Sequence, residues 1–198
     1  MTEEKDRSGY HHGDLRAALV AEARGLLEER GVEQLSLREV ARRAGVSRAA
    51  PYHHFKNKEA MVAAVAEAGF RELHASMGAP ADATAAARLE CGGRAYMTFA
   101  LDNPTVYRLM FGSKIGSMDE HPGLDTAAKA AFGQLVERIA EALPNEAEPE
   151  VRAMAVWGAV HGMASLLIDN LGPLDACGNR ERWVEASMEL IRHGLYDR

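Results

Sequence analysis

Basic side chains gather in one short stretch of the chain, residues 35–58, where they could bind phosphate groups. This stretch carries six basic residues and a single acidic one, Glu39, so its net charge is +5. The whole chain of 198 residues has a net charge of −6, which makes the positive charge a local feature. Clustered cations suit a phosphate backbone, but they also suit a solvated surface that has no partner. Charge alone favours the solvated surface.

The same stretch carries the signals of two short helices joined by a tight turn, which would position the cations. Ser36, with Glu39 three residues later, forms a capping box in front of an apolar helical stripe. Gly45 ends the first helix where the backbone needs a positive φ angle. Ser47 is expected to cap a second helix over 48–54. This is the pattern of a helix-turn-helix, whose second helix lies in the DNA major groove, and it favours DNA as the partner of the cations.

The segment A-R-R-A-G-V-S-R-A-A-P-Y-H-H-F-K-N-K-E (41–59) resembles the signature of tetracycline-repressor-type (TetR family) transcriptional regulators. Those proteins typically read I-A-x-x-A-G-V-S-x-G-T-L-Y-x-H-F-x-S-K-E, and the alignable residues run from about 12 to 72. The resemblance implies a three-helix DNA-binding domain followed by a helical domain for ligand binding and dimerisation. It also implies a homodimeric repressor that a small apolar or amphipathic effector releases from a palindromic operator on double-stranded DNA.

Side chains from both helices of this unit are expected to contact DNA. Arg48 could donate two hydrogen bonds to a guanine edge, and the methyl groups of Ala49 and Ala50 could touch thymine methyls. The resemblance implies that Tyr52 and Lys58 bind phosphates, which fix the position of the protein but carry no sequence information. The full expected set is Ser36, Arg38, Arg43, Ser47, Arg48, Ala49, Ala50, Tyr52, His53, His54, Lys56 and Lys58.

The second helix departs from the usual pattern of the family at two positions. Ala50 and Pro51 stand where threonine and leucine are usual. A proline at about the fourth helical position removes one early hydrogen bond, so it should distort the first turn. The helix itself is therefore better defined by the sequence than its individual base contacts.

The remaining sequence reads as helices without period-two strands or internal repeats, so the expected fold class is all-α. A polar arm should cover 1–12, a helix-turn-helix domain 13–60, and a helical effector-binding and dimerisation domain 61–198. Hydrophobic periodicity and capping residues predict helices from Asp14 to Gly31 and over 58–77, 84–101, 104–110, 124–143, 153–168 and 179–195.

Two smaller features leave alternatives open. In the N-terminal arm, Arg7, Tyr10, His11 and His12 could reach a DNA minor groove, or the arm could be disordered without a role. The histidine pair has no cysteine or carboxylate at ligand spacing, so no metal site or other cofactor is expected.

The cysteines Cys91 and Cys177 give no disulfide framework. Each is interpreted as a small buried hydrophobe, with a redox sensor as the alternative. Nothing resembles a signal peptide, so a cytoplasmic protein is expected.

The stretch 153–168 is apolar nearly all round, which indicates burial on several sides. It is too short, and with a histidine too polar, for a membrane span. It resembles a C-terminal domain of one TetR branch named WHG, with Trp157, His161 and Gly162 in the naming positions, and residues 96–112 also fit that branch. A histidine alone in an apolar helix could equally be a satisfied core residue. The expected effector pocket consists of Tyr96, Phe99, Tyr107, Met110, Phe111, Trp157 and His161, an apolar set with a few polar tips.

The last two helices carry more apolar surface than one subunit covers, which predicts a symmetric dimer. Gly158 and Gly162 each cost about 1 kcal/mol relative to alanine in a helix, and a close helix approach would offset that cost. The resemblance implies a four-helix bundle between subunits. The expected interface consists of Ala155, Gly158, Gly162, Ser165, Trp183, Ser187, Leu190 and Ile191.

These patterns favour a sequence-specific transcriptional regulator that is not an enzyme. No glycine-rich phosphate loop, nucleophile elbow or H-E-x-x-H motif occurs, so no catalytic residue is assigned. Two other classes stay open: a ligand-binding protein with an incidental helix-turn-helix, and a protein–protein adaptor. Both would lack sequence-specific affinity for DNA.

Overall fold

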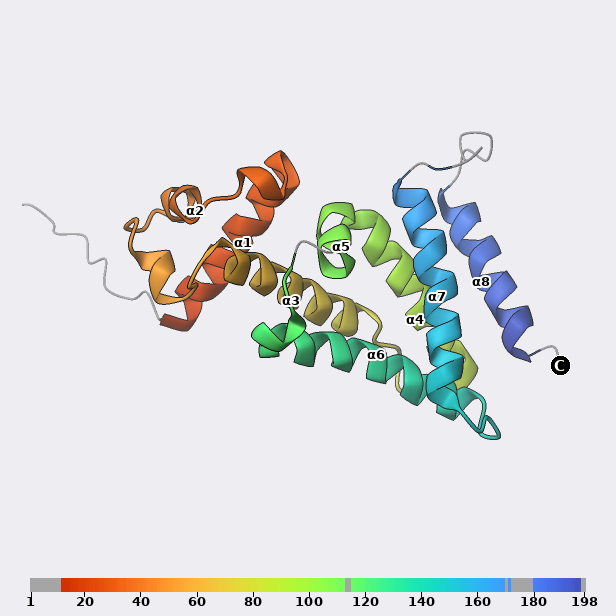
Figure 1. The fold of residues 1–198 in the computed structure, drawn as a ribbon. Coiled ribbons are helices and arrows are strands. Elements are labelled where there is room, and N and C mark those ends of the chain that lie inside the picture. Colours follow the sequence, from red (N-terminus) through yellow and green to blue (C-terminus); the bar gives the residue numbers. More distant parts are fainter. Residues whose placement is uncertain (1–11, 113–114, 170, 172–179, 197–198) are drawn as a thin grey trace, which may run out of the picture. The chain divides into compact units, whose positions relative to one another are not determined.

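The computed structural model describes residues 12–112, 115–169, 171 and 180–196. Within these ranges every regular element is a helix and no strand is present (Figure 1), which confirms the all-α fold class. The chain divides into two compact units, residues 1–65 and 66–198. The expectations for Arg7, Tyr10, His11 and Cys177 lie outside the described residues.

The first unit is built from short helical elements packed on one longer helix. Leu19 and Leu26 of the long helix, with Val40 and Phe55, are almost fully buried and form its core. The elements are α1 (His12–Arg30), the 3₁₀ helix η1 (Val32–Gln34), α2 (Leu37–Arg43), the 3₁₀ helix η2 (Ala50–His53) and the first turns of α3 (Lys58–Ser76). Because α1 begins at His12, Asp14 lies inside the helix and is not its cap.

Helix α2 begins and ends where its sequence predicts. The Ser36 hydroxyl accepts the backbone N–H of Glu39 at 3.2 Å. At the other end Gly45 has a φ of 67°, a conformation that costs glycine little. The N–H of Val46 reaches back to the Ala41 carbonyl at 3.0 Å, as in a Schellman motif. These two caps fix the turn of the helix-turn-helix.

The segment after this turn is not the α-helix expected over 48–54. It forms the 3₁₀ helix η2, and Ala49 rather than Ser47 occupies the N-cap position. Pro51 has no N–H to donate to the Ser47 carbonyl, which would be the first hydrogen bond of an α-helix starting at 48. The Ser47 carbonyl instead accepts from Ala50 at 3.0 Å. The expected distortion by Pro51 therefore extends over the whole element.

The second unit consists of helices packed around one core. Helices α4, α6 and α7 pack on one another, and α8 packs on α4 and α7 (Figure 1). Leu89, Ile139, Ala153 and Leu195 are buried together at the centre of this packing. The bounds are α4 (Ala85–Asp102), α5 (Pro104–Phe111), the 3₁₀ helix η3 (Met118–Glu120), α6 (Pro122–Ala142), α7 (Pro149–Ile168) and α8 (Arg180–Tyr196), joined by the rest of α3.

Cys91 on α4 does not fit its expected place in the core. It is a free thiol and is exposed. The interpretation of Cys91 as a small buried hydrophobe is therefore wrong. Its neighbour Gly92 is buried instead, so the helix presents the cysteine to solvent.

A candidate nucleic-acid interface and a candidate ligand cavity

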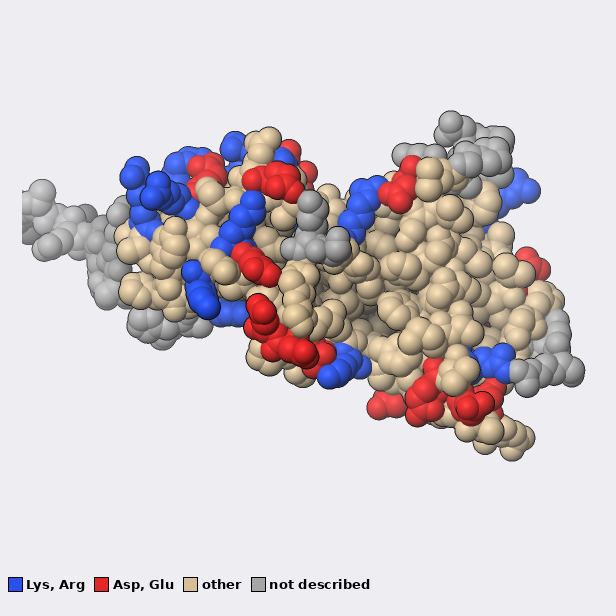
Figure 2. Space-filling model, in the orientation of Figure 1, with Lys and Arg blue, Asp and Glu red and all other residues tan. Residues whose placement is uncertain are grey.

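The expected DNA-binding residues lie mainly on the surface of the first unit. Arg43, Ala50, His54 and Lys58 are half-buried. The exposed members of the set are Ser36, Arg38, Ser47, Arg48, Ala49, Tyr52, His53 and Lys56. Figure 2 shows Lys and Arg side chains gathered on this unit, with Asp and Glu side chains among and beside them.

The turn η2 is anchored from inside and therefore presents its polar side chains outward. Pro51 and Phe55 are buried, and the Phe55 N–H donates to the Pro51 carbonyl at 2.8 Å. Tyr52, between them, keeps 54% of its surface exposed. A tyrosine with this exposure gains little from packing, but its ring and hydroxyl are free to contact a partner.

Two of the expected DNA contacts are held by the protein itself. The Arg43 guanidinium forms a two-pronged ion pair with the Glu29 carboxylate, which braces α2 against α1. This hydrogen-bonded pair lowers the pKa of Glu29 and raises that of Arg43. The Lys58 ammonium donates to the Glu33 backbone carbonyl at 3.0 Å. Arg43 and Lys58 thus have structural partners that the sequence does not indicate.

Three other cations of the set lack such partners. Arg38, Arg48 and Lys56 are exposed and form no ion pair with any residue in the described ranges. Glu39, the acid of this stretch, is held by Arg42 through hydrogen bonds of 2.8 and 2.7 Å, which lower its pKa to about 2. The surface around α2 and η2 therefore keeps uncompensated positive charge, as a polyanion-binding surface requires.

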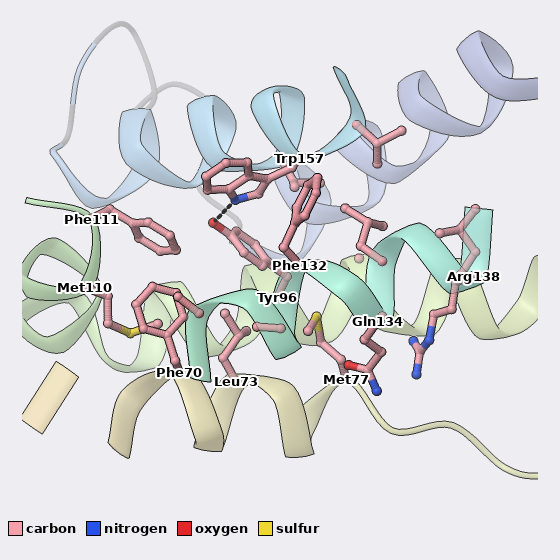
Figure 3. A pocket seen from close by; sticks show the side chains of 18 of the residues that line it. Phe70, Leu73, Met77, Tyr96, Met110, Phe111, Phe132, Gln134, Arg138 and Trp157 are labelled. Atoms are coloured by element: carbon pink, nitrogen blue, oxygen red, sulfur yellow. Dashed lines mark hydrogen bonds between the residues drawn. The ribbon is translucent and has the colours of Figure 1, made fainter. Parts of the chain in front are cut away.

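The second unit encloses a cavity of about 460 Å³, within the size range of ligand sites. Its walls come from helices α3 to α8, and most of the lining side chains are apolar or aromatic (Figure 3). Of the residues expected to form a pocket, Tyr96, Met110, Phe111 and Trp157 line this cavity. The Trp157 Nε1–H donates to the Tyr96 hydroxyl at 3.1 Å, the bond drawn in Figure 3.

The other expected pocket residues lie elsewhere. Tyr107 and His161 line a smaller pocket of about 190 Å³, together with Phe111, which borders both spaces. Phe99 is buried and lines neither. The expected single pocket is thus divided at Phe111.

Tyr96, Tyr107 and His161 form one hydrogen-bonded group. The Nδ1 of His161 lies 2.7 Å from the Tyr107 hydroxyl and 3.0 Å from that of Tyr96. Burial lowers the pKa of His161, raises that of Tyr107 to about 12 and raises that of Tyr96 as well. At neutral pH the histidine is therefore uncharged, and its Nδ1 can accept a hydrogen bond from a tyrosine hydroxyl. This placement fits the interpretation of His161 as a satisfied histidine.

Much of the cavity wall is not predicted by the sequence. The residues missed include Phe70 and Leu73 on α3, Met77 directly after it, Phe132, Gln134, Leu135 and Arg138 on α6, and Met188 on α8. Most of them continue apolar helical stripes, which are typical of a core. One signal is present in the sequence, because Arg138 stands three residues after Leu135 and interrupts such a stripe.

The outer face of α7 is apolar and uncovered. Val151, Met154 and Leu166 are 62%, 52% and 50% exposed. A Cβ atom added at Gly158 or Gly162 would meet no atom within 4 Å, so no helix of the described chain approaches these glycines. By length and composition alone, α7 could cross a membrane. Only 17% of its most apolar 18-residue stretch is buried.

The expected interface residues do not all face outward. Ala155, Gly158, Gly162 and Leu190 are exposed, whereas Ser165 and Trp183 are half-buried. Ser187 is buried, with its hydroxyl bonded to the Trp183 carbonyl at 2.7 Å, and Ile191 lines the cavity. Ser187 and Ile191 therefore belong to the interior of the unit.

Two family models match the chain. The model described as "Bacterial regulatory proteins, tetR family" matches residues 19–65. The model described as "Tetracyclin repressor-like, C-terminal domain" matches residues 89–190, which is more than half of the chain and includes α7.

Individual relatives agree with these matches. The chain is 47% identical over 60 residues to the tetracycline repressor protein class A from transposon 1721 of Escherichia coli, a match that covers 30% of this chain and 26% of that protein. The chain thus spans about a quarter of the length of the curated relatives it matches. A solved protein of unknown function from Rhodococcus sp. RHA1 is 33% identical, with a TM-score of 0.79 over 94% of this chain and 98% of that one.

A TetR variant from Acinetobacter baumannii AYE, solved in complex with minocycline, has a TM-score of 0.61 at 21% identity. The match covers 93% of this chain and 96% of that one. At this level of identity the likeness shows a shared fold alone.

Proposed function

This chain belongs to the tetR family of bacterial regulatory proteins, and from that premise we propose that it is a DNA-binding transcriptional repressor controlled by a small molecule. The observation that carries the proposal is the surface around α2 and η2. There Arg38, Arg48 and Lys56 are exposed without an acidic partner in the described chain, next to the exposed Tyr52.

On DNA, one of these side chains contacts a base and the others contact phosphates. Arg48 stands at the start of the segment that enters the major groove, where a guanidinium can bond two acceptors of a guanine. Arg38, Tyr52 and Lys56 flank it and bind phosphates, which set the register. Arg43 and Lys58 hold the unit together through Glu29 and the Glu33 carbonyl and contribute to DNA binding mainly through its shape.

The active form is a homodimer on a palindromic operator. The exposed apolar face of α7, with Val151, Met154, Gly158 and Gly162, needs cover, and a second copy of the same face provides it by two-fold symmetry. Two reading segments then have to lie roughly 34–36 Å apart, one turn of DNA. A soluble dimer of this kind acts in the cytoplasm, where the DNA is, and accounts for the apolar α7 without a membrane.

The cavity of the second unit is the effector site. A relative of the same fold was solved with minocycline bound, which supports a ligand-binding role for this fold. Helix α3 belongs to both units, because its first residues lie in 1–65 and Phe70 and Leu73 of the cavity wall follow on the same helix. A ligand that prefers one arrangement of α3 shifts the population towards it, with a coupling of typically 1–3 kcal/mol.

Selection of bound fragments from a random duplex library tests this function and needs no operator sequence in advance. The proposal expects enrichment of one palindromic sequence with two half-sites about one helical turn apart. Enrichment of no sequence, with binding that is weak and indifferent to sequence, would instead support a ligand-binding protein or an adaptor.

A further inference from the structure

The polar side chains of the cavity are not spread evenly around its wall. Gln134 and Arg138 stand one helical turn apart on α6, on the side of the cavity away from Phe70, Met110 and Phe111 (Figure 3). The opposite side is formed by aromatic rings and a thioether, with Phe70 and Phe111 packed edge to face at 5.3 Å. The cavity therefore has an apolar body and one polar end.

Arg138 brings a positive charge to this polar end. Its Nη1 donates to the Arg88 backbone carbonyl at 2.9 Å, and it forms no ion pair within the described chain. The neighbouring acid Glu141 is already bonded by the Arg88 guanidinium at 2.9 Å. Burial lowers the pKa of Arg138. A partly desolvated guanidinium without a counter-ion has unused capacity for an anion.

Space for this guanidinium is provided by Gly92 of α4. A Cβ atom at Gly92 would clash with Nη1 of Arg138. The absence of a side chain at this buried position of α4 therefore lets Arg138 stay at the cavity wall. The location of the charge follows from the packing of α4 against α6.

Gln134 adds an unsatisfied polar atom at the same end. Its Oε1 is buried and has no hydrogen-bond partner in the described chain. A buried polar atom that stays unpaired destabilises the fold, so this end of the cavity favours a ligand that pairs with it. The two ends of an amide exchange by rotation, so the buried position can equally hold the NH₂ group, which donates to an acceptor oxygen.

Two other polar groups of the wall, Glu90 and Tyr96, are already engaged. Glu90 is paired with Arg94 at 2.9 Å. The Tyr96 hydroxyl is bonded to Trp157, Tyr107 and His161. Arg192 also borders the cavity, but it is exposed to solvent. Among the less exposed groups of the wall, the unmet hydrogen-bonding capacity lies at the Arg138 guanidinium, which is cationic, and at the neutral Gln134 amide.

We propose that the ligand of this cavity is a carboxylic acid with an apolar body, bound as its carboxylate by the Arg138 guanidinium and the Gln134 amide. The inference rests on the proposed function, because it names the ligand class of the effector site proposed there. The apolar body lies against Phe70, Leu73 and Met77, and the carboxylate replaces the missing counter-ion. A guanidinium suits this head group because it can bind both carboxylate oxygens at once.

Three probes with the same alkyl chain separate the contribution of the head group from that of the body. Decanoate, decanol and decylamine are titrated into the full chain, without DNA, by isothermal calorimetry at neutral pH. Decanoate should bind about tenfold or more tightly than decanol, the effect expected of a charge-assisted hydrogen bond in a partly buried site. Decylamine should bind most weakly, because it brings a second cation to Arg138.

Variants locate the head group. Arg138→Gln should abolish the preference for decanoate over decanol while leaving decanol binding unchanged, and Arg138→Lys should retain part of the preference. Arg192→Gln is the matched control, because Arg192 also borders the cavity but is exposed, and it should keep the full preference. Thermal unfolding of each variant confirms that it is folded.

Several results would overturn the inference. These are equal binding of decanoate and decanol to the wild type, an unchanged preference in Arg138→Gln, loss of the preference in Arg192→Gln, or binding of none of the probes. Because no DNA is present, these outcomes are independent of whether the chain binds DNA. Failure of the proposed repressor function would appear only in a separate titration with duplex and no probe.

Discussion

At the scale of single residues, the cations of the first unit differ in whether a carboxylate faces them. Arg43 and Arg42 are held by Glu29 and Glu39, so their charge is largely used within the protein. Arg48 has no such partner in the described chain and is exposed at the start of the reading segment. The net charge of residues 35–58 thus overstates the positive charge that is available to bind DNA. The ion pairs of each arginine are needed to estimate that charge.

Replacement of Arg48 tests this distinction. Arg48→Ala should weaken binding to the selected operator by about 1–3 kcal/mol, roughly five- to 150-fold, for each half-site, and relax the preference at one base pair of each half-site. Arg24→Ala removes an arginine that is paired with Glu28 on α1, and it should leave operator affinity within about twofold, since such surface pairs contribute little. Fluorescence anisotropy with labelled duplex measures both. Equal losses in the two variants would contradict a direct role for Arg48.

Glu39 is expected to contribute to the acid dependence of stability, as are the other carboxylates with lowered pKa values, Glu29, Glu146 and Glu185. Hydrogen bonds from Arg42 lower the pKa of Glu39 from 4.5 to about 2 in the folded chain. A lowered pKa means that Glu39 stabilises the fold above about pH 4.5, and that this contribution is lost as the pH falls from 4.5 towards 2. Urea unfolding followed by circular dichroism should show a midpoint that decreases over this range. The midpoint of Glu39→Gln should decrease less steeply as the pH falls. An identical dependence in the variant would show that other groups dominate.

At the scale of elements, local signals account for several helix ends, but they miss the starts of α1 and α7 and the helix type of η2. The prediction of a helix over 58–77 matches α3, Lys58–Ser76, because Asn57 caps it through a 2.8 Å bond from the Ala60 N–H. A cap is encoded within three residues, so the sequence reveals it. The sequence predicts an α-helix for the second helix of the helix-turn-helix, but Pro51 converts it to a 3₁₀ turn.

The cavity is less accessible to sequence reasoning, because it depends on which helices pack together. Tyr96, Phe111 and Trp157 are expected in one pocket and do line the same cavity. The contributions of α3 and α6 follow from tertiary packing between segments far apart in sequence. Gly92 leaves room for the Arg138 guanidinium at the wall, and no local pattern records that relation.

Two glycine substitutions test the backbone of the first unit, and they are expected to change the free energy of unfolding in opposite directions. Gly45→Ala places a Cβ on a residue with a φ of 67° and should destabilise the first unit by about 1–2 kcal/mol. Gly25→Ala lies inside α1, where the nearest atom to the new Cβ is 3.9 Å away, and should stabilise it by up to about 1 kcal/mol. Urea unfolding of both variants measures the difference. Equal effects would mean that Gly45 does not need its positive φ angle.

At the scale of the whole molecule, the described residues of one chain leave the apolar face of α7 uncovered. Met154 and Leu166 are half exposed, and no described helix approaches Gly158 or Gly162. A helix with two interior glycines and an uncovered apolar side is stabilised most simply by close packing against its symmetry mate. The same dimer would present two reading segments to one operator, so assembly and DNA binding are linked.

Placing a charge on this face tests the link. Ala155→Arg, on the exposed side of α7, should convert the dimer to a monomer and weaken operator binding at least tenfold, because half of the contacts are lost. Ala130→Arg makes the same substitution at an exposed alanine of α6 and should leave the dimer intact. Size-exclusion chromatography with light scattering gives the mass. A monomeric wild type, or a dimeric Ala155→Arg, would place the interface elsewhere.

The most direct test of the central claim is the affinity of the full chain for its selected operator over a series of salt concentrations, compared with a scrambled duplex of the same length. A repressor should bind the operator about 10³-fold or more tightly than the scrambled duplex, and both affinities should fall steeply as salt rises. Arg38→Ala and Lys56→Ala should each reduce the slope of log affinity against log salt by about two, the loss of one phosphate contact in each subunit of the dimer. Equal affinity for the two duplexes at every salt concentration would contradict the assignment of this chain as a sequence-specific DNA-binding repressor.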